Sequence, residues 1–363
     1  MNKTITIILI SFLLISSCKS TIGTFKESPK TPKDYALNFL IKEKIPGMAI
    51  SVSKNGTIVW SEGFGYSNIS KKTKVSPKTT QFRIASISKP ITAVVLATLT
   101  DQGKVNVDAS LYKYLQDYPK KQYDFTLRQV GGHTSGIRHY KEGEFILNKK
   151  MSITEGLNIF KYDSLLFKPQ TDYKYSTYAW NLLSEVIQTV AKTPFETYTN
   201  NVLFKPLKMD DSVLDYCDSI MPNRTQFYRK TEDFKIKPAT QVCNEFKAAG
   251  GGFLSTSEDL IKFGNEIISP KLISKASLKD LTEPQILNSG KSTNYGIGFS
   301  IGKTKRGTPK YGHSGGGIGA STLLLIYPEE HVVISILTNL SNVPIYNIGN
   351  QLEAIFIDRP SKN

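Results

Sequence analysis

Strand-like segments lie at both ends of the chain with a long helical region between them, and this arrangement restricts the fold more than any other feature. Near the N-terminus, residues 48–53 and 57–60 alternate in polarity around Asn55-Gly56, a dipeptide typical of two-residue hairpin turns. Three later segments also have strand patterns: residues 295–301, 320–327 and 332–337. We therefore expect a mixed α/β (α+β) fold with one sheet built from residues 35–85 and 285–358, and a helical lobe mainly from residues 86–284.

The N-terminal residues predict export and attachment to a membrane. Lys3 precedes an apolar run at residues 5–15 that is too short to span a bilayer, and the run ends in Ile15-Ser16-Ser17-Cys18. This pattern resembles a bacterial lipoprotein signal peptide at residues 1–17, in which the Cys18 thiol is lipidated; a plain secretory signal with an incidental cysteine is the alternative. We expect residues 18–34 to form a tether, residues 35–358 to form the folded domain, and the protein to lie in the bacterial cell envelope, in the periplasm or at the cell surface.

Charge and composition narrow the classes of partner. The chain has 46 Lys and Arg against 31 Asp and Glu, a formal charge of +15, which favours anionic surfaces such as phospholipid. Because the lysines are scattered and not gathered in a basic arm, we expect no nucleic-acid partner. The spacing of the four histidines and the lack of a CxxC motif predict no metal site and no cofactor. Cys217 and Cys243 could form a disulfide in an oxidising compartment or remain two buried thiols.

The most informative short pattern is Ser86-Ile87-Ser88-Lys89, which opens a sustained apolar helix running to about Gln102 before Gly103. Residues three apart share a face of a helix but point to opposite faces of a strand. The same spacing recurs at Ser51/Lys54, Ser110/Lys113 and Ser300/Lys303. Two of these pairs lie in strand-like segments and the third lies among polar residues past Gly103. Ser86 is thus the candidate nucleophile and Lys89 the candidate base, with a simple helix N-cap as the alternative role of the serine.

A second hydroxyl commonly shares proton transfer in a serine–lysine site, and Tyr175 is the candidate. In Tyr175-Ser176-Thr177 it precedes an apolar helical run, so it lies at a loop-to-helix junction where a reacting group can be exposed. Another tyrosine, Tyr198, begins a literal Tyr-x-Asn sequence but lies in a segment typical of a helix surface. We therefore prefer Tyr175.

The third pattern is the glycine-rich segment Gly312-His313-Ser314-Gly315-Gly316. It satisfies G-x-S-x-G, which in a nucleophile elbow places the serine between a strand and a helix. Here a strand follows, and no Asp lies between Ser314 and His331. We expect instead an edge strand on which His313 faces the substrate and the glycines allow close approach of the backbone.

Together, these three patterns resemble the motifs of the serine beta-lactamase and penicillin-binding-protein superfamily, nearest its class C and D-aminopeptidase branch. Within it the chain is most similar to the mitochondrial serine beta-lactamase-like proteins and their bacterial relatives. Flanking segments carry the resemblance over about residues 35 to 358: residues 45–47, 133–140, 251–256, 295–298 and 319–321. The resemblance implies a mostly antiparallel sheet flanked by helices, with the site between sheet and helical lobe.

The resemblance also implies roles for individual residues. Ser86 would form an acyl-enzyme, either Lys89 or Tyr175 would act as general base, and the backbone N–H groups of Ser86 and Gly316 would form the oxyanion hole. The substrate-binding residues would be Thr177, His313, Ser314 and Gly315. His133 would be structural or support the site from behind.

Two departures from the usual motifs affect the substrate. Thr177 stands where many members have Asn, and His313 stands where many have a permanently charged Lys. Peptidase, amidase or esterase activity on a small-molecule or peptide substrate is therefore favoured over efficient beta-lactam hydrolysis. The alternative hypothesis is a non-catalytic envelope protein that uses the same scaffold for binding or assembly.

Overall fold

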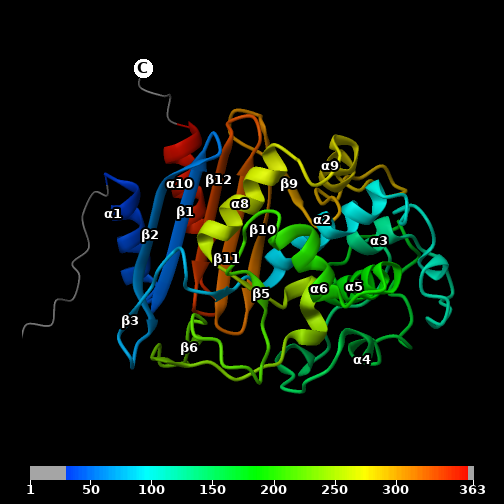
Figure 1. The fold of residues 1–363 in the computed structure, drawn as a ribbon, viewed down its shortest axis with the longest axis horizontal. Helices are drawn as coiled ribbons and strands as arrows, with labels where there is room; N and C mark the ends of the chain where they lie inside the picture. Colours follow the sequence, from blue (N-terminus) through cyan, green and yellow to red (C-terminus); the bar gives the residue numbers. More distant parts are fainter. Residues whose placement is uncertain (1–29, 359–363) are drawn as a thin grey trace, which may run out of the picture.

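The computed structural model describes residues 30–358, and its centre is a seven-stranded sheet in the order β3-β2-β1-β12-β11-β10-β9 (Figure 1). All neighbouring strands in it are antiparallel. The strands are β1 Gly47–Lys54, β2 Thr57–Asn68, β3 Thr73–Lys74, β9 Ser300–Lys303, β10 Pro309–Gly317, β11 Ala320–Tyr327 and β12 Val332–Thr338. N-terminal and C-terminal strands meet where β1 pairs with β12, so the expected sheet built from both ends of the chain is confirmed.

Turn chemistry accounts for where the strands begin and end. Asn55 and Gly56 both have positive φ, 52° and 78°, as the predicted hairpin turn requires. The strand expected at residues 295–301 is shorter than predicted: β9 begins only at Ser300 because the chain turns at Gly298, which has a φ of 83°.

Helices cover both faces of the sheet. α1 (Pro32–Lys42) and α10 (Tyr346–Glu353) pack together on one face, and α8 (Ser257–Ile268) covers the other (Figure 1). Thr31 caps α1 through a capping box, so residues 32–34, which we assigned to the tether, form the first turn of a helix. Buried apolar side chains form two clusters, one on each face of the sheet.

The helical lobe surrounds α2 (Ser88–Asp101), which is buried from Ser88 to Leu99 and precedes Gly103 with a φ of 69°. The predicted helix start at Ser86 differs in detail, because residues Ala85–Ile87 form a 3₁₀ turn, η1, before α2 begins. The lobe also contains α3 Leu127–Gly131, α4 Ile153–Leu157, α5 Thr177–Ala191, α6 Phe195–Thr199, α7 Ala248–Gly251 and α9 Lys275–Thr282. Smaller sheets are formed by β4 Phe82–Arg83, β8 Phe253–Ser255 and β5 Val213–Leu214, and by β6 Tyr228–Lys230 and β7 Ile236–Pro238.

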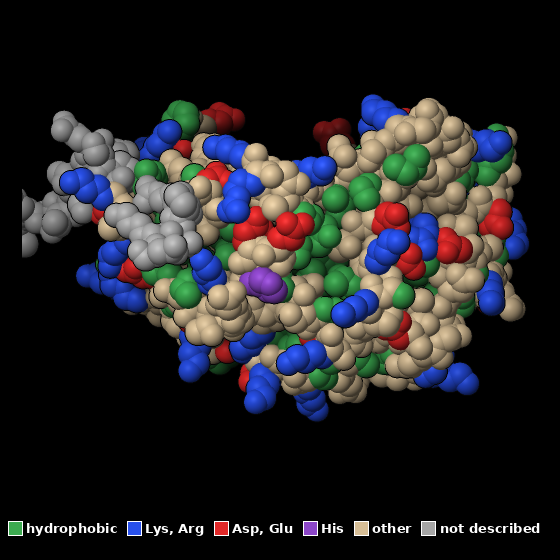
Figure 2. Space-filling model, turned by 90° about the horizontal axis from the view of Figure 1, so that it is seen from above, with side chains coloured by type: hydrophobic (Ala, Val, Ile, Leu, Met, Phe, Trp, Pro, Cys, Tyr) green, Lys and Arg blue, Asp and Glu red, His purple; other side chains and the backbone are tan. Residues whose placement is uncertain are grey.

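Lys and Arg side chains are spread over the face seen in Figure 2 and do not form one basic area there. No helix within residues 30–358 is both long and apolar enough to cross a bilayer. The predicted signal peptide and Cys18 lie outside the described residues.

Candidate active site

Ser86 is presented at a strained turn. β4 leads into η1, and Ala85, just before the serine, has a φ of 47°, a left-handed conformation that costs a non-glycine residue about 1–2 kcal/mol. Among residues 81–90, Ser86 alone is half-buried and the others are buried. The strained turn thus exposes this one side chain from an otherwise buried segment.

Lys89 lies one turn further on and is completely buried. Its Nζ is 3.1 Å from Ser86 Oγ, 3.3 Å from Thr177 Oγ1 and 2.6 Å from the carbonyl oxygen of Gly250, to which it donates. Burial lowers the pKa of Lys89 well below its ordinary value, and Lys89 forms no ion pair with the described residues. Its environment therefore favours the neutral amine, which is the form that can accept a proton.

Tyr175 approaches Ser86 directly: its hydroxyl is 2.8 Å from Ser86 Oγ. Lys89 Nζ lies 4.8 Å from the centre of the same ring. Burial raises the pKa of Tyr175, so the phenol stays protonated at neutral pH. Ser86 Oγ thus has a protonated hydroxyl on one side and a buried amine on the other.

Two histidines hold the Tyr-Ser-Thr segment in place. His133 Nδ1 accepts a hydrogen bond from the Ser176 N–H, and His139 Nδ1 accepts one from the Thr177 N–H, each at 3.1 Å. Both are neutral, because burial lowers the pKa of His139 to about 4 and that of His133 well below its ordinary value. His133 contacts the segment behind Tyr175 and not Ser86, in agreement with its expected supporting position.

The second half of β10 lies beside η1. β9 pairs with β10 only as far as Gly312, so residues 313–317 form a free edge, as expected for this segment. A Cβ atom on Gly315 would lie 2.4 Å from the carbonyl oxygen of Ile84, whereas one on Gly316 would meet nothing within 4 Å. Gly315 therefore allows the strand to touch the turn that carries Ser86, and Gly316 borders open space.

His313 is 6% exposed, and both of its ring nitrogens have partners. Nδ1 is 2.6 Å from the carbonyl oxygen of Ser314, and Nε2 is 2.9 Å from the Tyr295 hydroxyl. Because a carbonyl oxygen can only accept, Nδ1 carries the proton and Nε2 accepts from Tyr295. Burial lowers the pKa of His313 to about 3, so the ring is neutral and carries no positive charge toward a substrate.

These elements enclose a cavity of about 380 Å³. Of the predicted site residues, the following line it: Ser86, Tyr175, Thr177, His313, Ser314 and Gly316. Lys89 and Gly315 lie immediately behind its wall. Tyr198 does not line the cavity, and its hydroxyl instead lies 3.2 Å from Thr98 Oγ1.

The other serines considered from the sequence do not lie in an arrangement like that of Ser86, Lys89 and Tyr175. Ser314 lies inside strand β10 and not on a strand-to-helix turn, so the G-x-S-x-G interpretation lacks its required geometry. Ser51 and Ser300 lie in strands, and Ser110 caps a 3₁₀ turn through the Tyr112 N–H.

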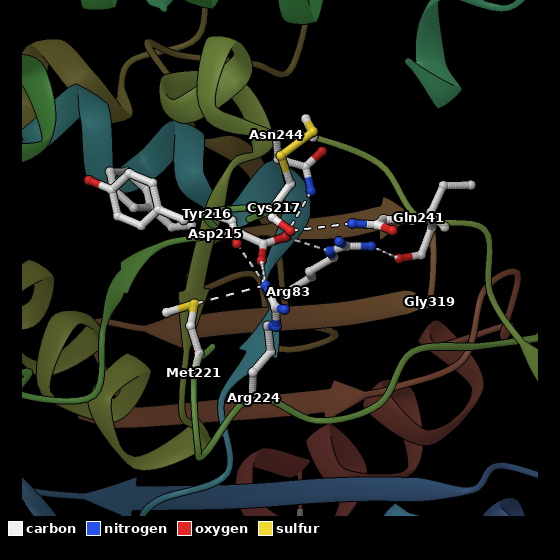
Figure 3. A network of polar contacts seen from close by, with 12 residues as sticks. Arg83, Asp215, Tyr216, Cys217, Met221, Arg224, Gln241, Asn244 and Gly319 are labelled. Atoms are coloured by element: carbon white, nitrogen blue, oxygen red, sulfur yellow. Dashed lines mark hydrogen bonds and ion pairs between the residues drawn. A yellow bond between two sulfur atoms is a disulfide. The ribbon is translucent and has the colours of Figure 1, made fainter. Parts of the chain in front are cut away.

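A network of charges and a disulfide brace the wall of the cavity near the end of β10, where Arg83 also binds the carbonyl oxygen of Ile318 (Figure 3). Asp215 binds Arg83 at 2.6 Å, Arg224 at 3.1 Å and the Asn244 amide at 3.0 Å. Cys217 and Cys243 form a disulfide with Cα atoms 4.9 Å apart, which decides between the two states left open by the sequence. The bond joins the chain segment after Asp215 to the segment that carries Asn244.

Sequence reasoning did not identify three residues of this site: His139, Tyr295 and Lys247. His139 and Tyr295 lie in segments that the family resemblance had marked, but without an assigned role. Lys247 is a single lysine in the apolar run Phe246-Lys247-Ala248-Ala249. A lysine within such a run is a usable signal, because burying an amine is costly unless it has a purpose.

Comparisons with known proteins found one matching family model and several similar chains. The model of the Beta-lactamase family matches residues 25–354. The "Serine beta-lactamase-like protein LACTB, mitochondrial" of Homo sapiens is 27% identical, with 84% of this chain and 75% of that protein covered. The octameric penicillin-binding protein homologue from Pyrococcus abyssi has a TM-score of 0.80 at 23% identity, with 90% of this chain and 77% of that chain covered. A D-stereospecific amidohydrolase from Streptomyces sp. has a TM-score of 0.75 at 22% identity, with 88% and 96% covered. The two structures share the fold described above.

Proposed function

Because the chain belongs to the beta-lactamase family, we propose that it is a serine hydrolase that forms an acyl-enzyme at Ser86 while hydrolysing an amide, peptide or ester. The observation that carries this proposal is the pair of contacts at Ser86 Oγ: Lys89 Nζ at 3.1 Å and Tyr175 Oη at 2.8 Å. A weakly acidic hydroxyl needs a base in contact with it, and this arrangement provides one together with a proton donor.

The hydrogen bonds around Lys89 are consistent with one distribution of protons. A neutral amine has two hydrogens and one lone pair. If the hydrogens go to Gly250 O and Thr177 Oγ1, the lone pair faces Ser86 and accepts its proton as Oγ attacks a carbonyl carbon. The Tyr175 hydroxyl, protonated at neutral pH, then donates a proton to the leaving nitrogen or oxygen. Lys89 acts as general base and Tyr175 as general acid in this scheme.

The oxyanion of the tetrahedral intermediate would be held by the backbone N–H groups of Ser86 and Gly316, which line one cavity. Each such donor contributes on the order of 3 kcal/mol to transition-state stabilisation. Water attacks the acyl-enzyme in the second half of the reaction. Tyr175 then accepts a proton from the water, and Lys89 returns a proton to Ser86 Oγ.

We assign the substrate to the peptidase, amidase or esterase classes and not to the beta-lactams. Thr177 presents a short hydroxyl that already interacts with Lys89, and His313 is neutral with both nitrogens engaged. Neither residue supplies the amide or the permanent cation of the usual motifs. The D-stereospecific amidohydrolase named above shares this fold, and amide hydrolysis lies within the proposed class.

We further propose that the protein is anchored in a bacterial envelope by a lipid on Cys18. The sequence pattern at residues 15–18 supports the anchor, and the Cys217–Cys243 disulfide supports an oxidising compartment.

Labelling with a fluorophosphonate probe tests the hydrolase proposal. We expect a mass increase on Ser86 in the folded protein and its loss in Ser86→Ala. Ser110→Ala is the matched control, because Ser110 has the same Ser-x-x-Lys spacing but lies outside the cavity. A folded preparation that no such probe labels, but that a ligand stabilises without turnover, would favour the non-catalytic binding protein instead.

A further inference from the structure

Lys247 is a buried cation with an incomplete set of partners. Its side chain lines the cavity of Ser86, yet the residue is only 4% exposed. Nζ donates to the carbonyl oxygen of Phe145 at 3.2 Å and forms no ion pair within residues 30–358. Burial lowers the pKa of Lys247 to about 8, so the amine remains mostly protonated at pH 7. A protonated amine has three donors, and one acceptor leaves two of them for a ligand.

Two carboxylates influence Lys247 without contacting it, and Oε2 of one of them, Glu245, has no hydrogen-bond partner among the described residues. Asp215 and Glu245 act on Lys247 only from a distance. Asp215 is shared by Arg83 and Arg224, and Glu245 Oε1 accepts a hydrogen bond from the Cys217 N–H at 2.9 Å. The charge of Lys247 is therefore not neutralised by a contact within the described part of the chain.

The remainder of the cavity wall offers no competing negative charge. Among the described residues that line the cavity, the charged side chains are Arg83 and Lys247. Arg83 is already paired with Asp215 at 2.6 Å and also binds the carbonyl oxygen of Ile318. An anionic group in the cavity would therefore find its free counter-charge at Lys247.

Lys247 lies against an aromatic wall of the cavity. Its Nζ is 5.5 and 5.7 Å from the ring centres of Tyr140 and Phe145. His139 continues this wall toward Ser86, because its ring centre lies 4.3 Å from that of Tyr140 and 5.8 Å from that of Tyr175. A ligand bound to Lys247 therefore lies in the same cavity as Ser86.

We propose that the enzyme prefers substrates that carry a carboxylate, which is bound by Lys247 beside the rings of Tyr140 and Phe145. This inference rests on the proposed function because it concerns the substrate, but the anion site itself does not depend on catalysis. A charge-assisted hydrogen bond to a largely buried amine favours such a ligand over its neutral analogue by about tenfold or more.

Binding to the Ser86→Ala protein tests the inference without turnover. Calorimetry at pH 7 would compare glutaryl 4-nitroanilide, which has an anionic acyl group, with pentanoyl 4-nitroanilide, its neutral counterpart. We expect the glutaryl compound to bind at least tenfold more tightly. Adding Lys247→Met should remove this preference while leaving pentanoyl binding within about twofold, and Lys247→Arg should retain it. Lys104→Met is the control, because Lys104 is exposed at the end of α2.

Two results would overturn the inference: equal affinities in the Ser86→Ala protein, or an equal loss of both affinities in Lys247→Met. Fluorophosphonate labelling separates this outcome from failure of the proposed function. Labelling of Ser86 without any anionic preference removes the inference and leaves the hydrolase. A Lys247-dependent preference in a protein that is never labelled removes the hydrolase and leaves the anion site.

Discussion

Replacing Lys89 by methionine is expected to abolish hydrolysis and, at neutral pH, to make the protein more stable. Lys89 is completely buried, and burial lowers its pKa well below the ordinary value. In the proposed mechanism the folded protein therefore holds a neutral amine at pH 7, where the unfolded chain would protonate it. Methionine fills nearly the same volume and carries no such cost.

The size of the effect follows from the two protonation states. The reference pKa of a lysine amine, about 10.4, lies about 3.4 units above pH 7. At about 1.36 kcal/mol for each unit, keeping the amine neutral at pH 7 costs about 4.6 kcal/mol. Methionine also leaves the buried carbonyl oxygen of Gly250 without its donor at 2.6 Å, which costs about 1–3 kcal/mol. With about 2 kcal/mol for that carbonyl oxygen, the expected net gain at pH 7 is about 2.6 kcal/mol of unfolding free energy.

The pH dependence has a definite sign. Between the folded-state pKa of Lys89 and about 10.4 the unfolded wild-type chain binds one more proton than the folded one, so wild-type stability rises with pH relative to the variant. The advantage of Lys89→Met should shrink by about 3.4 kcal/mol between pH 7 and pH 9.5, and the two stabilities should cross.

Urea unfolding of both proteins at several pH values measures this difference. Lys104→Met serves as the control, and its stability should stay within about 0.5 kcal/mol of wild type at each pH. A Lys89→Met protein that is less stable than wild type at pH 7, or a difference that does not change with pH, would refute the reasoning.

Four further predictions concern separate features. Tyr175→Phe should lower kcat by about a hundredfold or more with little change in KM, because the proposed general acid is lost; steady-state kinetics check this. Gly315→Ala should lose about 1–3 kcal/mol in urea unfolding because a methyl group meets the η1 backbone, whereas Gly316→Ala should unfold like wild type. Cys217→Ala should lose about 3.5 kcal/mol, since the disulfide spans 26 residues, and a reducing agent should destabilise wild type but not the variant. Cys18→Ser should move the protein from the membrane to the soluble fraction on cell fractionation, without a diacylglycerol mass.

The sequence was sufficient to place the sheet and to predict that Ser86, Lys89 and Tyr175 come together. Alternating segments and an Asn-Gly turn predict strands, and a helix start predicts that Ser86 and Lys89 share a face. Contacts between loops could not be predicted from the sequence. No periodicity indicates that His139 supports Thr177, or that Tyr295 donates to His313 and so leaves that ring no free nitrogen. Such contacts depend on where irregular segments pass in space, which local pattern does not encode.

The pairing of β1 with β12 also determines how much of the chain must be present before the candidate site can assemble. Met48 lies opposite Thr338, so the middle of the sheet joins residues almost a whole domain apart in the chain. β10, which closes the cavity beside Ser86, is held in the sheet by β11, and β11 is held by β12. A nascent chain that ends before Val332 contains the serine, the lysine and the tyrosine but not the strand that joins both halves of the sheet. Long-range pairing of this kind forms late and slowly, so the candidate site around Ser86 stays unassembled until nearly the whole domain is present.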